Sequence, residues 1–341
     1  MAILERAGEE FLRIVQGNPA TQAGAIMLEY IPSAQYGNGW FTPSNIMHRL
    51  SVLGNNLSSE SLRKWTSSYN FPVLTAKKNI GVILAGNIPF SGADDLFAVL
   101  ITGHRFTGKT SSDDPRLFRM MVEVFHELAP ELKEEIVLQD AIMKNMDAVI
   151  ATGSNNSGRY FEHYFSKYPH IIRKNRNGVA VLNGHESNEE LFRLGEDVFR
   201  YFGLGCRNVT KLFVPSGYSF DRFFENIVSY GDELMMAKKY MNNYEYHKTV
   251  YLLNNVKLLD NHFLILKEDE GISSPPGVLF YEFYNDPSEL KNKLESEQDR
   301  IQCVVSNAFQ WDNTVPIGTA QNAGLADYAD NTDSVKFLLG L

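Results

Sequence analysis

From residue 80 the chain reads Ile80-Gly-Val-Ile-Leu-Ala85, and it then turns through Gly86-Asn-Ile-Pro-Phe90. Six residues that are almost wholly apolar predict a short strand covered on both faces, the kind of strand found in parallel sheets. After it, helical and strand-like patterns alternate. Helices are expected over 92–101, 114–128 and 157–167, and strands over 104–107, 135–138, 148–151 and 170–172. This alternation predicts a parallel sheet with helices on both faces and ligands at the carboxyl ends of its strands.

The second half of the chain begins the same alternation again after Asn177-Gly178, where we expect a domain boundary. Strands are expected over 179–182, 211–214, 277–283 and 301–305, and helices over 188–202, 220–230, 232–242 and 287–297. The first 70 residues are expected to form helices interrupted at Pro19, Pro32 and Pro43. From residue 307 on, the chain is expected either to return to the first domain or to add a strand to a neighbouring subunit. The fold class is therefore α/β.

The composition excludes several classes of function. Of the 341 residues, 44% are hydrophobic and 21% are charged, as is typical of a soluble globular protein. A net charge of −9 argues against a nucleic-acid partner, because no basic surface dominates. Two cysteines are too few for a disulfide framework, so the reducing cytoplasm is the expected compartment. The N-terminus does not read as a signal peptide, and no segment approaches the roughly 20 apolar residues that span a bilayer.

Cys206 lies in the run Tyr201-Phe-Gly-Leu-Gly-Cys206, and the apolar segment Lys211-Leu-Phe-Val214 follows it. Two glycines leave the backbone open just before the sulfur. A thiolate in such a place can carry an acyl group as a thioester, because thiolates are both strong nucleophiles and good leaving groups. The alternative is a small buried apolar residue, which is the role expected of Cys303 in its apolar strand. Arg207 and Lys211 are charged neighbours that could lower the thiol pKa, although Lys211 is better placed to face solvent or to pair with a carboxylate.

Polar residues follow three of the expected strands in the first half of the chain. Asn87 stands in the first turn, where its amide could donate to an oxyanion. Lys109, with Ser111 and Ser112 behind it, ends the second strand and suits a ribose or a phosphate. The later turn Thr152-Gly153-Ser154, with Gly158 beyond it, leads into a helix whose first amides could face a pyrophosphate. Each signal is weak alone, because turn-forming residues occur in such places without any ligand.

Taken in this order, the motifs resemble those of the aldehyde dehydrogenase superfamily from about residue 79 onward. That superfamily has an Asn-x-Pro turn, a strand-end Lys-Pro-Ser/Ala-Glu, a Thr-Gly-Ser…Gly turn, and a cysteine followed five residues later by Arg-Val-Phe-Val. Here these read Asn87-Ile-Pro89, Lys109-Thr-Ser-Ser112, Thr152-Gly-Ser…Gly158, and Cys206 followed by Lys211-Leu-Phe-Val214. Within the superfamily the chain is most similar to the LuxC-type acyl-CoA reductases, through Gly205-Cys-Arg-Asn-Val-Thr-Lys211 and residues 321–330.

The resemblance implies two doubly wound α/β domains with a cleft between them and a C-terminal oligomerisation segment. Residues 1–178 would then hold N-terminal helices and the nucleotide-binding domain, 179–306 the catalytic domain, and 307–341 the return segment and oligomerisation tail. Cys206 and Asn87 would be catalytic. The residues implied in binding a nicotinamide cofactor are Lys109, Ser111, Ser112, Thr152, Gly153, Ser154 and Gly158. No metal is implied, and a homo-oligomer, dimer or tetramer, is expected.

Two departures from the superfamily pattern refine the expected activity. The usual Glu-Leu-Gly-Gly segment, whose Glu activates water, is replaced by Arg173-Lys-Asn-Arg-Asn-Gly178, so hydrolysis of an enzyme thioester should be slow. Exchange with another thiol is then favoured, which is acyl-CoA chemistry. Ser112 replaces an acidic residue that would repel a 2′-phosphate, which favours NADPH over NADH. The expected function is NADPH-dependent reduction of an acyl-CoA, or of an acyl-carrier thioester, to an aldehyde, with fatty acyl groups as the expected class.

Two other functions stay open. The first is NAD(P)-dependent oxidation of an aldehyde to an acid, which needs a carboxylate base from elsewhere, such as Glu186. The second is a catalytically silent binding or assembly subunit that keeps the fold. His185 is the first histidine to consider as a general acid or base, whereas His104, His163 and His247 fit surface or core positions better.

Overall fold

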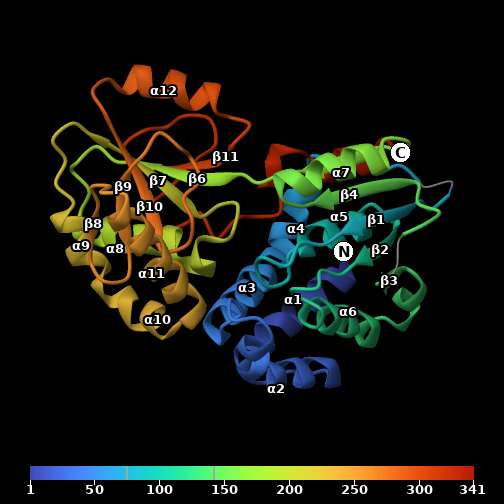
Figure 1. The fold of residues 1–341 in the computed structure, drawn as a ribbon. Helices are drawn as coiled ribbons and strands as arrows, with labels where there is room; N and C mark the ends of the chain where they lie inside the picture. Colours follow the sequence, from blue (N-terminus) through green and yellow to red (C-terminus); the bar gives the residue numbers. More distant parts are fainter. Residues whose placement is uncertain (74–75, 141–142) are drawn as a thin grey trace. The chain divides into compact units, whose positions relative to one another are not determined.

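The computed structural model describes residues 1–73, 76–140 and 143–341 (Figure 1). The chain divides into two compact units. Unit 1 consists of residues 1–175 and 323–341, and unit 2 of residues 176–322. The functional assignment of the two units, as nucleotide-binding and catalytic, stays a prediction.

Unit 1 contains a five-stranded, wholly parallel sheet with the strand order β3-β2-β1-β4-β5. The strands are β1 (Asn79–Ile83), β2 (Arg105–Lys109), β3 (Ile136–Gln139), β4 (Ala148–Thr152) and β5 (His170–Arg173). β1 is central and is covered on both faces, as its apolar sequence predicts. Ile80 and Val82 are buried in the large core of the unit, while a Cβ on Gly81 would meet the Met146 sulfur.

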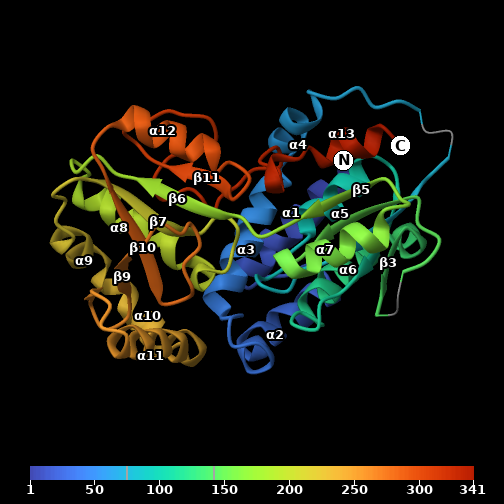
Figure 2. The same ribbon diagram turned by 45° about the horizontal axis from the view of Figure 1, so that its top comes forward.

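Helices cover this sheet, and four of them precede its first strand in the chain. They are α1 (Ala2–Val15), α2 (Gln22–Gly37), α3 (Pro43–Asn56), α4 (Ser59–Thr66), α5 (Ala93–Ile101), α6 (Leu117–Leu128), the 3₁₀ turn η1 (Pro130–Glu134), α7 (Asn155–Phe165), η4 (Ala329–Asn331) and α13 (Ser334–Leu339). α7 packs beside β4 and β5, as both ribbon views show (Figures 1 and 2). Large apolar side chains such as Phe11, Phe97 and Phe125 fill the core between the helices and the sheet.

Unit 2 contains a seven-stranded sheet with the order β12-β11-β6-β7-β10-β9-β8. Only the pair β8–β9 is antiparallel among its paired strands. The strands are β6 (Asn177–Val181), β7 (Val209–Pro215), β8 (Leu259–Asp260), β9 (Ile265–Glu268), β10 (Val278–Tyr284), β11 (Ile301–Val305) and β12 (Thr314–Val315). The helices are α8 (Asn188–Phe199), η2 (Arg200–Gly203), α9 (Asp221–Ile227), η3 (Val228–Tyr230), α10 (Gly231–Met236), α11 (Lys238–Leu253) and α12 (Pro287–Ser296). The predicted α/β class with parallel sheets is confirmed.

Several predicted helix boundaries are wrong, each for a local reason. Pro32 lies inside α2 instead of ending it. α6 begins at Leu117, not at residue 114, because the Asp114 carboxylate accepts the Leu117 N–H at 2.9 Å and so caps the first turn. The helix expected to run to residue 202 ends at Phe199. The segment expected as one helix over 232–242 is broken at Ala237 and continues as α11 to Leu253.

The C-terminal residues 323–341 belong to unit 1 and end in a helix, α13, rather than in a strand. α13 packs against α5. Tyr328 holds the segment in place, because its hydroxyl accepts the Trp65 indole N–H at 2.7 Å and lies 2.5 Å from the Tyr69 hydroxyl. Within the described part of the chain, no helix has both the length and the apolar character that crossing a membrane requires.

Candidate functional site

The predicted cofactor residues of unit 1 lie along one edge of its sheet. Ile83, the last residue of β1, is paired in register with Lys109 on β2 and with Ala151 on β4. The strands are parallel, so Lys109 and the turn that begins at Thr152 occupy the same carboxyl edge on the two sides of β1. Asn87 follows β1 by four residues and is exposed in the turn that leads to α5. This is the edge at which the architecture places ligands.

A cavity of about 290 Å³ lies at this edge of unit 1. Its lining includes the strand-end residues Ile83 and Lys109 together with Tyr160, Phe161 and Tyr164 of α7. Tyr160 and Tyr164 remain 76% and 56% exposed, so their rings are accessible to a ligand. Aromatic faces of this kind suit contact with a flat ring. The sequence reasoning found Lys109 but missed these aromatic residues.

The glycines at this edge permit close packing between its turns. A Cβ on Gly86 would lie 2.6 Å from the Ser111 hydroxyl oxygen, so the turn after β1 touches the turn after β2. A Cβ on Gly153 would lie 2.8 Å from the Phe161 ring. Ser154 is the N-cap of α7, and its hydroxyl accepts the Ser157 N–H at 3.2 Å. The Lys174 side chain covers Gly158. Its nearest carbon would lie 3.1 Å from a Cβ added to this glycine. Ser112 is exposed.

Cys206 of unit 2 lies on a tight turn between η2 and β7 and is half-buried. The turn spans Gly205 to Asn208, because the Asn208 N–H donates to the Gly205 carbonyl at 3.0 Å. The chain reaches this turn through three consecutive residues in the left-handed region, Tyr201 (φ 54°), Phe202 (φ 57°) and Gly203 (φ 78°). The left-handed backbone ends the helical path that the sequence pattern predicts to continue to Phe202. The sulfur is thus carried on a loop of defined conformation directly before a central strand.

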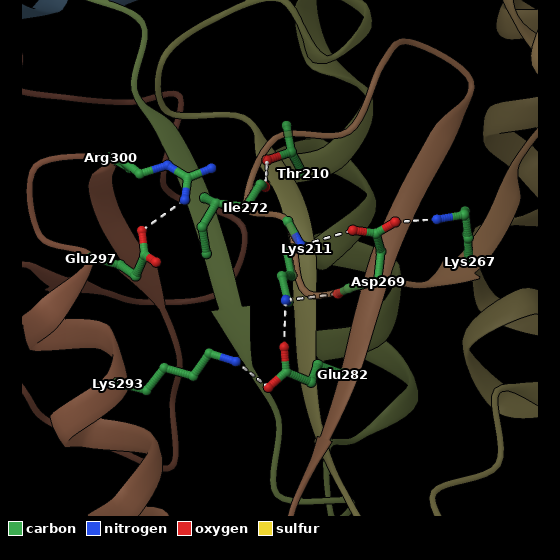
Figure 3. Close-up of polar contacts among 10 residues, drawn as sticks. Thr210, Lys211, Lys267, Asp269, Ile272, Glu282, Lys293, Glu297 and Arg300 are labelled. Carbon is green, nitrogen blue, oxygen red and sulfur yellow. Dashed lines mark hydrogen bonds and ion pairs between the residues drawn. The ribbon is translucent and has the colours of Figure 1, made fainter.

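Lys211 on β7 is wholly buried, and its ammonium group is held by unit 2 itself (Figure 3). It donates to the Glu282 carboxylate at 2.6 Å and to the Asp269 carbonyl at 2.8 Å. Of the two placements considered from the sequence, pairing with a carboxylate is therefore confirmed and exposure to solvent is wrong. Burial lowers the pKa of Lys211, and the Glu282 charge opposes that decrease.

The Glu282 carboxylate also accepts a hydrogen bond from the ammonium of Lys293 on α12, with 2.5 Å between nitrogen and oxygen (Figure 3). Burial would raise the pKa of Glu282, but the two lysines together hold it below its usual value of 4.5. This ion cluster lies within the sheet and beneath α12, so it joins β7, β10 and α12. The Cys206 turn therefore runs into a strand that is anchored electrostatically.

We expect Glu282→Ala to lower the free energy of unfolding by about 2–3 kcal/mol, because it leaves the Lys211 charge buried without its carboxylate. The value lies below that of a fully buried pair since the Glu282 side chain is 24% exposed. Folding lowers the pKa of Glu282, so this stabilisation is present above pH 4.5 and is lost as the pH falls through the lowered pKa. Urea unfolding at pH 7 measures it.

Glu297→Ala is the matched control, because Glu297 pairs at 2.9 Å with Arg300, whose side chain is 55% exposed. Its loss should cost no more than about 1 kcal/mol. Equal destabilisation by the two variants would contradict the assigned role of the Lys211–Glu282 pair.

The remaining candidates of unit 2 have local structural partners. Cys303 is 1% exposed, as expected of a buried thiol, and its sulfur lies 3.9 Å from the Arg207 carbonyl oxygen. The Glu186 carboxylate accepts the Asn183 and Gly184 N–H groups at 2.6 and 3.1 Å, so it closes its own turn. His185 is exposed beside it.

The histidines of unit 1 differ in their surroundings. His104 is buried, with Nδ1 accepting the Lys78 N–H at 3.3 Å and Nε2 lying 3.1 Å from the Leu338 carbonyl oxygen, so it is a satisfied core residue. His163 is exposed on α7, at the rim of the cavity that Lys109 lines.

The structure thus gathers the predicted residues in two places. Lys109, Ser111, Ser112, the turn from Thr152 to Ser154, Gly158 and Asn87 belong to the sheet edge of unit 1, and Cys206 belongs to unit 2. Besides the aromatic residues of α7, sequence reasoning missed Asn208, which is fully buried beside Cys206. Its signal was present in Gly205-Cys-Arg-Asn208, because an asparagine two residues after a candidate nucleophile is a common turn former.

Comparison with known proteins gives a partial match in sequence and many matches in three-dimensional structure. No family model matches the chain. A long-chain acyl-protein thioester reductase from Aliivibrio fischeri is 26% identical over 126 residues, which cover 33% of this chain and only 26% of that protein. This chain therefore matches about a quarter of that relative.

Solved structures of aldehyde dehydrogenases match nearly the whole chain. Aldehyde dehydrogenase 21 from Physcomitrella patens, in complex with the product succinate, matches with a TM-score of 0.66 and 13% identity over 100% of this chain and 84% of that one. The putative aldehyde dehydrogenase PutA from Anabaena variabilis matches with a TM-score of 0.61 and 13% identity, over 95% and 83%. An aldehyde dehydrogenase from Bacillus cereus, in complex with NAD⁺, matches with a TM-score of 0.62 and 11% identity, over 89% and 72%.

At such low identities these structures establish the fold alone. The first two of these matches extend over 100% and 95% of this chain. The resemblance inferred from the motifs is thereby confirmed at the level of the fold: this chain has the fold of the aldehyde dehydrogenases.

Proposed function

We propose that this protein reduces an acyl-CoA, or an acyl group carried on a protein, to an aldehyde with NADPH, through a thioester on Cys206. The observation that carries the proposal is the half-buried Cys206 on a closed turn at the start of β7, in a chain with an aldehyde dehydrogenase fold. The partial match to a long-chain acyl-protein thioester reductase supports a thioester substrate. An apolar acyl chain is the substrate class that this relative suggests.

The proposed chemistry begins at the Cys206 sulfur. Its thiolate attacks the carbonyl carbon of the acyl thioester, and the electron pair of the C=O bond moves to oxygen. The Asn87 amide and the Cys206 backbone N–H are the proposed donors to this oxyanion. The C–S bond to CoA then breaks, CoA leaves as a thiolate, and the acyl group stays on Cys206. Collapse of the later thiohemiacetal releases aldehyde and restores the cysteine thiolate.

The residues at the sheet edge of unit 1 suit a nicotinamide nucleotide. The cavity offers aromatic faces for a planar base. Lys109, at the end of β2, is the proposed partner for a ribose or phosphate oxygen. α7 has 11 residues and begins at Asn155, with Ser154 as its N-cap, so its first N–H groups provide the partial positive charge that attracts a pyrophosphate. When bound, the cofactor would supply the hydride that converts the Cys206 thioester to a thiohemiacetal.

NADPH is the proposed form of the cofactor because no carboxylate follows Lys109 at position 112 to repel a 2′-phosphate. Arg119 of α6 provides a guanidinium near this strand end. It donates to the Asp140 carboxylate at 2.5 Å, and Nη2 also lies 3.4 Å from the Thr110 hydroxyl oxygen. The Asp140 side chain is 82% exposed, so Arg119 can exchange this partner for a phosphate at little cost.

Arg119→Ala is expected to weaken NADPH binding about tenfold or more, since a hydrogen bond to a charged group contributes about 1.5–3 kcal/mol. NADH binding should hardly change. Fluorescence titration with each nucleotide measures both affinities without any turnover. Arg116→Ala is the matched control, because Arg116 precedes the same helix but lies over the Tyr30 ring at 5.6 Å. If Arg119→Ala lowers the affinity for NADPH and the affinity for NADH by the same factor, the proposed preference for NADPH is wrong.

The experiment that tests the function is mass spectrometry of the intact protein after incubation with acyl-CoAs of graded length, without reductant. The expected result is a mass increase equal to one acyl group, with release of one CoA. Addition of NADPH should then restore the original mass and give the aldehyde. No acyl adduct at any chain length would overturn the proposal.

The two alternative functions predict other products. An aldehyde-oxidising enzyme would form acid from aldehyde and NAD(P)⁺, which requires a base to activate water. Both carboxylate oxygens of Glu186, the base considered for this role, already accept backbone N–H groups, so the structure does not favour it. A silent subunit would form no adduct. Stoichiometric labelling of Cys206 with iodoacetamide, blocked by acyl-CoA, would argue against that function.

A further inference from the structure

The amide of Asn208 closes the turn that carries Cys206. Its Oδ1 accepts the Gly205 N–H at 2.8 Å, and its own backbone N–H donates to the Gly205 carbonyl at 3.0 Å. Cys206 and Arg207 are the two residues between these bonds. Asn208 has no exposed surface, so water cannot replace either contact.

The other end of the same amide reaches the end of α8. Nδ2 donates to the Arg200 carbonyl at 2.7 Å and lies 3.1 and 3.4 Å from the carbonyl oxygens of Asp197 and Val198. The last carbonyls of a helix lack hydrogen-bond donors within the helix, and the Asn208 amide provides a donor for those of α8. The partners also determine which way the amide points, because the reversed orientation would place its NH₂ against the Gly205 N–H and its oxygen against three carbonyls.

The backbone of Asn208 holds the turn against the sheet. Its carbonyl accepts the Gly178 N–H of β6 at 2.8 Å. A Cβ on Gly178 would lie only 2.6 Å from the Arg207 carbonyl oxygen, so β6 and the turn pack backbone to backbone. Asn208 therefore uses its N–H, its C=O and both ends of its side chain to join α8, the Cys206 turn and β6.

The hydrogen bonds of Asn208 compensate for backbone strain in the segment that leads to Cys206. Tyr201 and Phe202 are non-glycine residues in the left-handed region, which costs about 1–3 kcal/mol for each residue. Both side chains are buried, and the Phe202 ring packs against Tyr240 with 5.8 Å between the centroids. Without the Asn208 amide, the segment between Phe202 and Asn208 would have fewer contacts to hold this conformation.

We propose that Asn208 is the positioning residue for Cys206: it sets the direction of the sulfur and of the Cys206 N–H toward the thioester carbonyl. The inference rests on the proposed function, because it takes Cys206 as the nucleophile. Asn208 acts through the turn and has no role in the covalent chemistry. Its removal should slow attack on a carbonyl, which depends on direction, far more than attack on a small alkylating reagent, which does not.

The test compares two rate constants in the full-length chain. Acylation by dodecanoyl-CoA is followed by intact mass under single-turnover conditions, and alkylation by iodoacetamide is followed in the same way. Asn208→Ala is expected to lower the acylation rate constant about tenfold to hundredfold, as expected for a displaced reacting group. The alkylation rate constant should stay within about twofold, so the ratio of the two rate constants falls. Asn208→Ser, whose hydroxyl can still accept the Gly205 N–H, should lie between wild type and Asn208→Ala.

Asn261→Ala is the matched control. Asn261 also closes a turn in unit 2, with Oδ1 accepting the Leu264 N–H at 2.9 Å, and it precedes β9 rather than β7. Its loss should leave the ratio unchanged. Asn208→Ser is the variant to measure if Asn208→Ala does not fold.

Three outcomes would overturn the inference. The first is acylation at the wild-type rate in a folded Asn208 variant, and the second is an equal fall of both rate constants, which would assign Asn208 to the fold alone. The third is a wild-type protein that takes no acyl group, and this result alone would also overturn the proposed function.

Discussion

Cys206→Ala should lose acylation entirely: after incubation with acyl-CoA the variant is expected to keep its original mass. The methyl group that replaces the thiol cannot form the C–S bond on which every later step depends. This is the largest effect expected of any single substitution in the chain. Intact-protein mass spectrometry measures it, and assay of NADPH oxidation with acyl-CoA should show the same loss.

Cys303→Ala is the control for this substitution, because Cys303 is the second cysteine and is 1% exposed. It should still take one acyl group at close to the wild-type rate. An acyl adduct on the Cys206→Ala protein, or reductase activity at the wild-type level, would show that another group carries the reaction.

Asn87→Ala is expected to lower the rate of acylation about 10²–10³-fold, or about 3–4 kcal/mol in the barrier, because this is the usual cost of removing one oxyanion donor. Asn87 is exposed in the turn after β1. Single-turnover acylation by acyl-CoA measures the rate, and urea unfolding measures the stability.

Asn79→Ala, at the opposite end of the same strand, provides the comparison. The Asn79 Oδ1 accepts the Thr107 hydroxyl at 2.7 Å and its Nδ2 donates to the Asn145 carbonyl at 3.0 Å, so its amide joins neighbouring segments of unit 1. Its loss should lower stability and leave acylation of the folded protein unchanged. If Asn87→Ala is acylated as fast as wild type, the oxyanion must be stabilised by other groups.

Strand identity was predictable from the sequence because it depends on local pattern. Ile80 to Ala85 is apolar at nearly every position, and β1 is indeed central and covered on both faces. Helix ends were less predictable. The apolar periodicity of α8 continues through Tyr201 and Phe202 and predicts a longer helix. In the structure the backbone of these two residues is left-handed, and both aromatic side chains are buried in unit 2.

The candidate site divides in the same way. Cys206, Asn87, Lys109 and the turn at Thr152 could be named from motif order, since each motif is short and contiguous. Their roles stay predictions. The aromatic lining contributed by α7 could not be named, because only the folded unit places Tyr160 and Tyr164 around the same cavity as Ile83 and Lys109.

The sequence by itself determined the α/β class, the parallel strands of unit 1 and the cysteine that lies between a helix and a strand, since all of these follow from neighbouring residues. Tertiary structure decided the partners of buried polar groups. Lys211 could equally have faced water, and Asn208 reads in the sequence as an ordinary turn residue. Glu282 lies 71 residues from Lys211 and Asp197 11 residues from Asn208. Only folding brings these groups together, because a polar group that has lost its water must find its partner wherever the chain places one.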